Sequence, residues 1–146
     1  MSSFHKRIIL CQEGDPLALA VALGAGFIAR GFSGKSDQLV KIIVQAIEYK
    51  GFALVDVLQP CVSFNRINTF KWFNDRAYEL SDDFPTDNLA AAFAKCQEFE
   101  EKIPLGVIYR KERTTYEDHL PFLAGPALIH RERKPEKVAA LFDSFK

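Results

Sequence analysis

The sequence has little cysteine, no excess of either charge and no long hydrophobic run. Its three cysteines, Cys11, Cys61 and Cys96, are widely spaced and odd in number, which argues against a disulfide framework and for a reducing, cytoplasmic compartment. Nineteen basic residues balance nineteen acidic ones, so binding to nucleic acid or to an anionic membrane surface is disfavoured. No apolar run approaches the roughly 20 residues of a membrane span, and residues 8–11 are too few for a secretory segment.

What the chain does contain is enough apolar material for a sizeable core, and its pattern predicts an α/β fold. Hydrophobic residues make up 48% of the 146 residues. After a short helix over residues 17–23, residues 27–29 read as a buried strand. Residues 39–47 then carry apolar side chains at helical spacing, and residues 52–58 form a β-rich run. This strand–helix–strand order predicts two parallel neighbouring strands with flanking helices.

The pattern changes after residue 66, where we place a boundary between two parts, 1–66 and 67–146. In the second part we expect an aromatic-rich helix over residues 68–80 and another helix that begins at Asp87 or Asn88. Residues 103–109 read as a short strand, and because Pro104 stands near its start we expect it at a sheet edge or in a separate excursion. A final helix follows Pro135.

In open parallel sheets, functional residues gather beyond the carboxyl ends of the strands, which here predicts the loops at residues 30–34 and 59–65. The second loop holds Cys61 directly after Pro60. Such a thiol is either a metal ligand or nucleophile, or an ordinary structural cysteine. A nucleophile would need a base, and none of the three histidines is placed near it by spacing. Residues 31–36 end in Gly-Lys-Ser but lack the first glycine of a phosphate loop.

Three segments, in their order and spacing, resemble a known family. They are Ala25-Gly26-Phe27-Ile28-Ala29-Arg30-Gly31-Phe32-Ser33-Gly34, then Ala46-Ile47-Glu48-Tyr49-Lys50-Gly51-Phe52, then Leu58-Gln59-Pro60-Cys61-Val62-Ser63-Phe64-Asn65. Together with residues 103–109 and 112–117, they resemble the second half of the β subunit of 2-oxoacid:ferredoxin oxidoreductases. The form of the third segment is more similar to the 2-oxoglutarate or broad-specificity branch than to the pyruvate branch.

The resemblance implies a thiamine diphosphate-binding α/β fold with a C-terminal extension. It also implies a subunit that binds thiamine diphosphate through Mg²⁺ and holds a [4Fe–4S] cluster on four cysteines, with Cys61 as the fourth ligand. Oxidative decarboxylation to an acyl-coenzyme A, with electrons passing to ferredoxin, is the implied reaction. The implied partners are an α-type subunit and ferredoxin.

The sequence lacks the family's CxxC pair, its remaining cluster cysteine and its Gly-Asp-Gly segment. We therefore expect a truncated product, a split subunit or a fragment that is inactive without the missing N-terminal half of the β subunit. The alternative hypothesis is a non-catalytic assembly module that kept the fold and lost cofactor binding.

Overall fold

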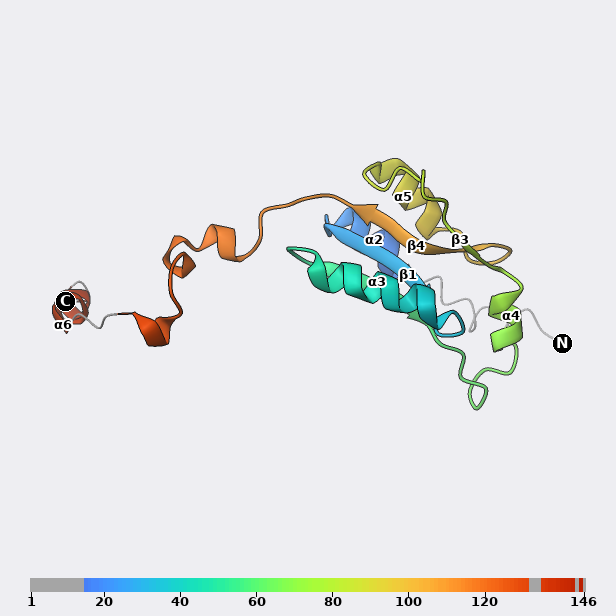
Figure 1. The fold of residues 1–146 in the computed structure, drawn as a ribbon, viewed down its shortest axis with the longest axis horizontal. Coiled ribbons are helices and arrows are strands. Elements are labelled where there is room, and N and C mark those ends of the chain that lie inside the picture. The colour runs from blue at the N-terminus through green and yellow to red at the C-terminus, as the bar shows by residue number, and fades with distance from the viewer. Residues whose placement is uncertain (1–14, 132–134, 144, 146) are drawn as a thin grey trace. The chain divides into compact units, whose positions relative to one another are not determined.

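The computed structural model describes residues 15–131, 135–143 and 145. Contacts between residues divide the chain into two compact units, unit 1 up to Arg113 and unit 2 from Thr114. The elements of unit 1 are α2 (Pro16–Ala22), β1 (Phe27–Phe32), α3 (Ser36–Glu48), β2 (Ala53–Leu58), α4 (Phe70–Asn74), β3 (Ala77–Glu79), α5 (Leu89–Cys96) and β4 (Ile103–Arg110) (Figure 1). The elements of unit 2 are three short 3₁₀ turns, η1 (Glu117–His119), η2 (Pro121–Leu123) and η3 (Leu128–His130), and the helix α6 (Pro135–Asp143).

Three helices of unit 1, α2, α4 and α5, begin where short polar side chains satisfy free backbone N–H groups. Asp15 accepts hydrogen bonds from the N–H groups at the start of α2, in front of Pro16 at its first position. Thr69 caps α4 and Asn88 caps α5 in the same way. These caps replace the hydrogen bonds that the first helical turn cannot make internally, which stabilises each helix start by about 1 kcal/mol.

Unit 1 is built around one mixed four-stranded sheet with the order β2-β1-β4-β3. β1 and β2 are parallel, with Phe27 opposite Ala53 and Phe32 opposite Leu58. β4 is antiparallel to β1 and parallel to β3. The predicted α/β class and the parallel β1–β2 pair are therefore confirmed, while β4 makes the sheet mixed.

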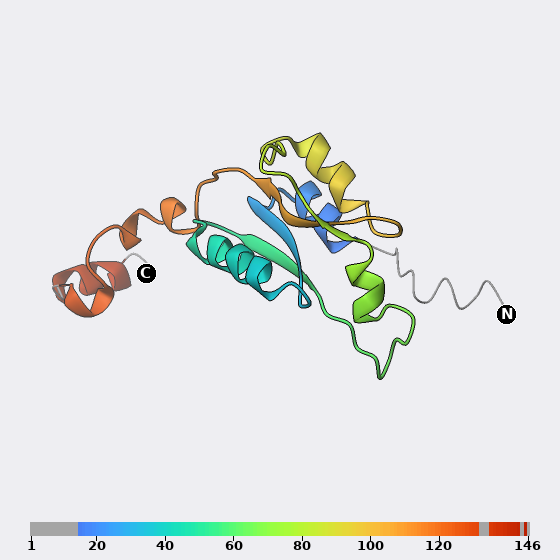
Figure 2. The same cartoon turned by 45° about the vertical axis from the view of Figure 1, so that its right-hand side comes forward.

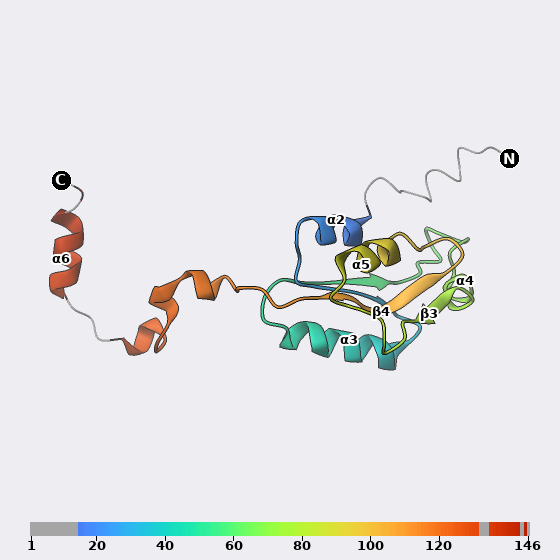
Figure 3. The same ribbon diagram turned by 90° about the horizontal axis from the view of Figure 1, so that it is seen from above.

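Helices cover both faces of this sheet, so that unit 1 has three layers. Figure 3 shows α3 on one side and α2 with α5 on the other. Between α3 and the sheet lie Phe27, Ala29, Ile42 and Tyr49. On the opposite face the core joins α2, α5 and the sheet through buried residues that include Leu17, Ile28, Ala92, Cys96 and Ile108.

Two expectations about the second half of the chain were wrong. Residues 68–80 are not one helix, because α4 ends at Asn74 and Ala77–Glu79 pairs with β4 as β3. β4 is not at an edge but lies between β1 and β3. Pro104 is tolerated there, in register with Tyr78, since a proline lacks only one of the ladder's N–H groups. Gly106 adopts a φ of 133° inside β4, a conformation that favours glycine.

The predicted boundary after residue 66 falls inside unit 1, whose sheet takes strands from both sides of it. As a division of the chain into two functional parts it stays a prediction. Within the described ranges, the model contains no helix that is both long and apolar enough to cross a membrane.

Candidate functional site

Cys61 lies in the loop that leaves β2, and its side chain is exposed. Figure 2 shows this loop, between β2 and α4, projecting beyond the end of the sheet. The carbonyl of Cys61 accepts hydrogen bonds from the N–H groups of Phe64 (3.1 Å) and Asn65 (2.8 Å), which closes a tight turn. The Asn65 side chain fixes the next turn by accepting from the N–H groups of Ile67 and Asn68. The thiol is thus presented to solvent on a hydrogen-bonded loop.

The loops predicted at residues 30–34 and 59–65 lie at the carboxyl ends of β1 and β2, although residues 30–32 belong to β1 itself. The Ser33 N–H donates to the carbonyl of Leu58 at 3.0 Å, which joins the end of one strand to the end of the other. Lys35 is the residue directly before α3, and its ammonium group forms a long ion pair with Glu79, at 3.5 Å. Residues 33–35 therefore form a tight connection between β1 and α3.

The other cysteine of unit 1 that the structure describes, Cys96, is buried in the core between α5 and the sheet. Burial, assisted by the charge of Asp15, raises the pKa of its thiol to about 11. A neutral buried thiol is a poor metal ligand and a poor nucleophile. Cys11 lies outside the described residues.

No group of three or more His, Cys, Asp or Glu side chains suited to a metal is present among the residues that the structure describes. Residues 15–113, the described part of unit 1, also contain no histidine. A thiol enzyme that uses Cys61 with a histidine from this part of the chain is therefore excluded.

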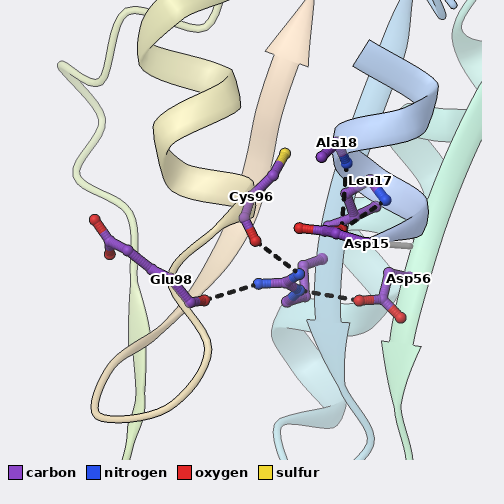
Figure 4. A network of polar contacts seen from close by, with 7 residues as sticks. Asp15, Leu17, Ala18, Asp56, Cys96 and Glu98 are labelled. Atoms are coloured by element: carbon purple, nitrogen blue, oxygen red, sulfur yellow. Dashed lines mark hydrogen bonds and ion pairs between the residues drawn. The ribbon is translucent and has the colours of Figure 1, made fainter. Parts of the chain in front are cut away.

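A buried ion pair connects the two parallel strands, and the sequence analysis missed it. Arg30, at 2% exposure, points its guanidinium at the carboxylate of Asp56, with Nε and Oδ2 2.9 Å apart. The same guanidinium donates to the carbonyls of Glu98 (3.2 Å) and Cys96 (3.5 Å), as Figure 4 shows. Its Cζ also lies 5.5 Å from the ring centre of Phe99.

This network ties β1 and β2 to the segment that follows α5, and each nitrogen of the buried guanidinium donates to a protein acceptor. Its role is therefore structural. One signal was available in the sequence: each strand carries a single charged residue, of opposite sign, and Arg30 and Asp56 are directly in register.

A second polar cluster joins β3 to the end of α5. The Tyr78 hydroxyl donates to Glu98 at 2.6 Å, and the Lys95 ammonium donates to both Tyr78 (3.0 Å) and Glu98 (2.7 Å). Burial alone would raise the pKa of Glu98, but the hydrogen bonds from Lys95 and Tyr78 outweigh burial and lower it. Burial and the bond to Glu98 raise the pKa of Tyr78. The three groups satisfy one another, so we assign them to holding α5 against the sheet.

Comparison with known families gives one match that begins at the candidate loop. A family model described as the C-terminal part of the pyruvate ferredoxin oxidoreductase beta subunit matches residues 61–125. The matched region therefore starts at Cys61 itself.

Curated relatives carry similar names. The chain is 42% identical over 118 residues to 2-oxoacid:ferredoxin oxidoreductase 1, subunit beta, of Aeropyrum pernix, covering 73% of this chain and 37% of that protein. It is 35% identical over 119 residues to 2-oxoacid:ferredoxin oxidoreductase subunit beta of Saccharolobus solfataricus, covering 73% of this chain and 39% of that protein. The chain spans less than half the length of these relatives.

A solved structure shares the fold. It is 2-oxoglutarate:ferredoxin oxidoreductase from Magnetococcus marinus, with 2-oxoglutarate, coenzyme A and succinyl-CoA bound. The alignment has a TM-score of 0.74 and 29% identity, and it covers 88% of this chain and 44% of that one.

Proposed function

Because this chain is a relative of the C-terminal portion of 2-oxoacid:ferredoxin oxidoreductase β subunits, we propose that it acts as that portion of such an enzyme. The predicted resemblance is confirmed, and it supports a place for the chain in an oxidoreductase complex. The proposal goes further on three points: the chain contributes a cluster ligand, it depends on a preceding part of the β subunit, and it is inactive alone.

The observation that carries the proposal is the position of Cys61. It is an exposed thiol on a hydrogen-bonded loop at the carboxyl end of β2. Iron–sulfur clusters are held by cysteine thiolates, usually four. Cys61 fits the role of one such ligand, while the buried Cys96, with its raised pKa, does not. We infer that Cys61 completes a cluster whose other ligands come from outside the described part of this chain.

The residues beside Cys61 support the same inference. Phe64 is 95% exposed and Val62 is 58% exposed, so two apolar side chains lie at the surface beside the exposed thiol. Covered by a partner, they would keep water from a cluster bound at Cys61 and so affect its reduction potential.

The thiamine diphosphate and Mg²⁺ of the reaction are assigned to the preceding part of the β subunit, because this sequence has no Gly-Asp-Gly segment to hold them. Bound there, the thiamine cofactor supplies the carbanion chemistry that decarboxylates a 2-oxoacid. The residues of this chain supply a ligand, a rigid loop and apolar cover. The proposed partners are therefore the preceding part of the β subunit, an α-type subunit and ferredoxin.

The test is anaerobic reconstitution of the chain together with the preceding part of a relative's β subunit, followed by measurement of iron and acid-labile sulfide. The wild-type chain is compared with Cys61→Ser and with Cys96→Ala as the matched control. We expect bound iron with the wild type and with Cys96→Ala, and loss of most of it with Cys61→Ser. Equal iron in all three would remove Cys61 from the ligand set, and no iron in any of them favours the non-catalytic assembly module.

A further inference from the structure

Helix α3 carries two different flanks beside the face that it buries against the sheet. On one flank lie four apolar side chains at helical spacing, which we call the apolar flank: Val40 (58% exposed), Ile43 (39%), Val44 (46%) and Ile47 (77%). On the other flank lie Gln38, Lys41, Gln45 and Glu48. A helix that met only solvent on its outer side would be polar on both flanks.

The apolar flank faces the β2 side of the sheet. Tyr49, at the end of α3, donates its hydroxyl to the carbonyl of Lys111 beyond β4, at 2.6 Å. A helix turns by about 100° per residue. Around the helix axis, Gln45 and Tyr49 are therefore displaced from the buried Ile42 in the same direction, toward β4. Ile43 and Ile47 lie on the opposite side, toward β2.

β2 itself is the outer strand of the sheet among the described residues. Its carbonyls at Phe52 and Leu58 accept from the N–H groups of Phe27 and Ser33, on the β1 side. Backbone groups alternate in direction along a strand, so the N–H and C=O groups of Ala53, Val55 and Val57 point away from β1. A row of unpaired backbone groups next to exposed apolar side chains is a template for another strand.

The same edge is apolar on the opposite face of the sheet. Leu19 (57% exposed) of α2 and Leu23 (79%), just after α2, lie beside Phe52 (66%), which precedes β2, around a shallow hollow of about 320 Å³. Exposed apolar side chains thus lie on both faces of the sheet at the open edge of β2. This is expected where the sheet and its covering helices continue past this strand.

On the basis of the function proposed above, we propose that this edge docks the preceding part of the β subunit, through a strand parallel to β2 and a helix against the apolar flank of α3. The chain spans only 37–48% of the length of its curated relatives. The family model assigns residues 61–125 to the C-terminal part of the subunit, so most of the additional length of the relatives precedes them. The incoming strand is parallel because helices cover both faces at this edge, as in parallel sheets.

β1 is not an open edge, because it is paired on both sides. The exposed edge is one strand further out, at β2.

The test uses the full chain co-expressed with the part of the Aeropyrum pernix β subunit that precedes the matched region, with an affinity tag on that part. Amide hydrogen exchange is measured residue by residue, for the chain alone and for the complex. The two matched variants are Ile47→Lys on the apolar flank and Gln45→Lys on the polar flank, each adding one positive charge to the same helical turn.

We expect the amides of Ala53, Val55 and Val57 to exchange at least about tenfold more slowly in the complex, whereas Leu54 and Asp56, already bonded to β1, change little. Ile47→Lys should weaken binding at least about tenfold, and Gln45→Lys by less than about twofold. The docking site is wrong if the two parts co-purify but the edge amides stay fast and both variants bind equally, an outcome that leaves the proposed function standing. Two other results also overturn the docking site. One is that the edge amides of the chain alone exchange slowly in a way that depends on protein concentration, and the other is that the two parts do not co-purify. In either case the iron measurement tests the proposed function separately.

Discussion

The ion pair between Arg30 and Asp56 gives the most demanding test of how unit 1 is held together. Replacing Asp56 by Asn keeps the shape of the side chain but removes its charge. The Arg30 guanidinium then remains buried, at 2% exposure, and its partners are an uncharged amide, two carbonyls and one ring in place of a carboxylate. Removing one partner of a buried pair costs more than the pair itself contributes.

The expected loss follows from the geometry. A hydrogen bond to a charged group contributes about 1.5–3 kcal/mol. The Asp56 side chain is 26% exposed, so partial screening by water places the loss near the middle of that range, at about 2 kcal/mol. For a domain of this size, each kcal/mol shifts the melting temperature by about 4–8 °C, so Tm should fall by roughly 8–16 °C.

The assay is thermal unfolding followed by circular dichroism, with urea unfolding as the second measurement. Lys35→Gln serves as the control, since it breaks the exposed 3.5 Å pair with Glu79 and should cost less than about 0.5 kcal/mol. Arg30→Met and the double variant complete a cycle whose coupling should exceed about 1 kcal/mol. A fall in Tm below about 2 °C for Asp56→Asn, or additive effects in the cycle, would refute the assignment of this pair as the main polar tie between the strands.

Three further predictions concern other parts of unit 1. With iodoacetamide at pH 8, Cys61 should be alkylated at least about 100-fold faster than Cys96, whose thiol is buried and has a pKa of about 11, as followed by peptide mass spectrometry. Gly26→Ala should lower the stability by about 1–3 kcal/mol in urea unfolding, because its new Cβ would lie 1.9 Å from the Tyr49 hydroxyl. Glu98→Gln should cost up to about 1 kcal/mol at neutral pH. Since the folded pKa of Glu98 is lowered, this difference should vanish as the pH falls below its ordinary value of 4.5.

Each of these three predictions would be contradicted by a specific result. Equal alkylation of both cysteines would mean that the core around α5 opens readily in solution. An unchanged midpoint for Gly26→Ala would mean that the tyrosine hydroxyl does not hold its bond to the Lys111 carbonyl. A difference for Glu98→Gln that persists at low pH would mean that the carboxylate charge is not what stabilises the cluster.

The first strand, the helix after it and the second strand could be predicted because their signals are local. Leu39 to Ile47 repeats at helical spacing, and the structure has a helix over Ser36–Glu48. Residues 52–58 are β-rich and end before Pro60, and the strand covers Ala53–Leu58. A parallel pair then follows from strand–helix–strand order alone.

β3 and the place of β4 could not be predicted in this way, because they depend on pairing between distant residues. Ala77–Glu79 is a strand of three residues whose only support is its ladder with β4. Pro104 is a local signal for an edge, but β4 gains hydrogen bonds from two neighbours, and these outweigh the one that proline cannot make.

The same distinction between local signals and long-range pairing applies to the candidate site. The neighbouring positions of the ends of β1 and β2 follow from parallel topology, and the Ser33–Leu58 hydrogen bond extends this pairing just past β1. The chemistry of Cys61 does not follow from a lone cysteine, and it rests on the resemblance to a family. The pairing of Arg30 with Asp56 required the register of the two strands, which the sequence gives only once parallel pairing is assumed.

The position of β4 also affects how the chain folds while it is being synthesised. β1 is complete by Phe32, but one of its two neighbours is made of residues 103–110, some seventy positions later. On the ribosome, β1 and β2 must therefore wait as an incomplete pair through the synthesis of α4, β3 and α5, which at about 5–20 residues per second lasts several seconds. Conditions that slow translation across residues 59–102 should lengthen this exposure and increase the fraction of chains that aggregate or bind chaperones before β4 emerges.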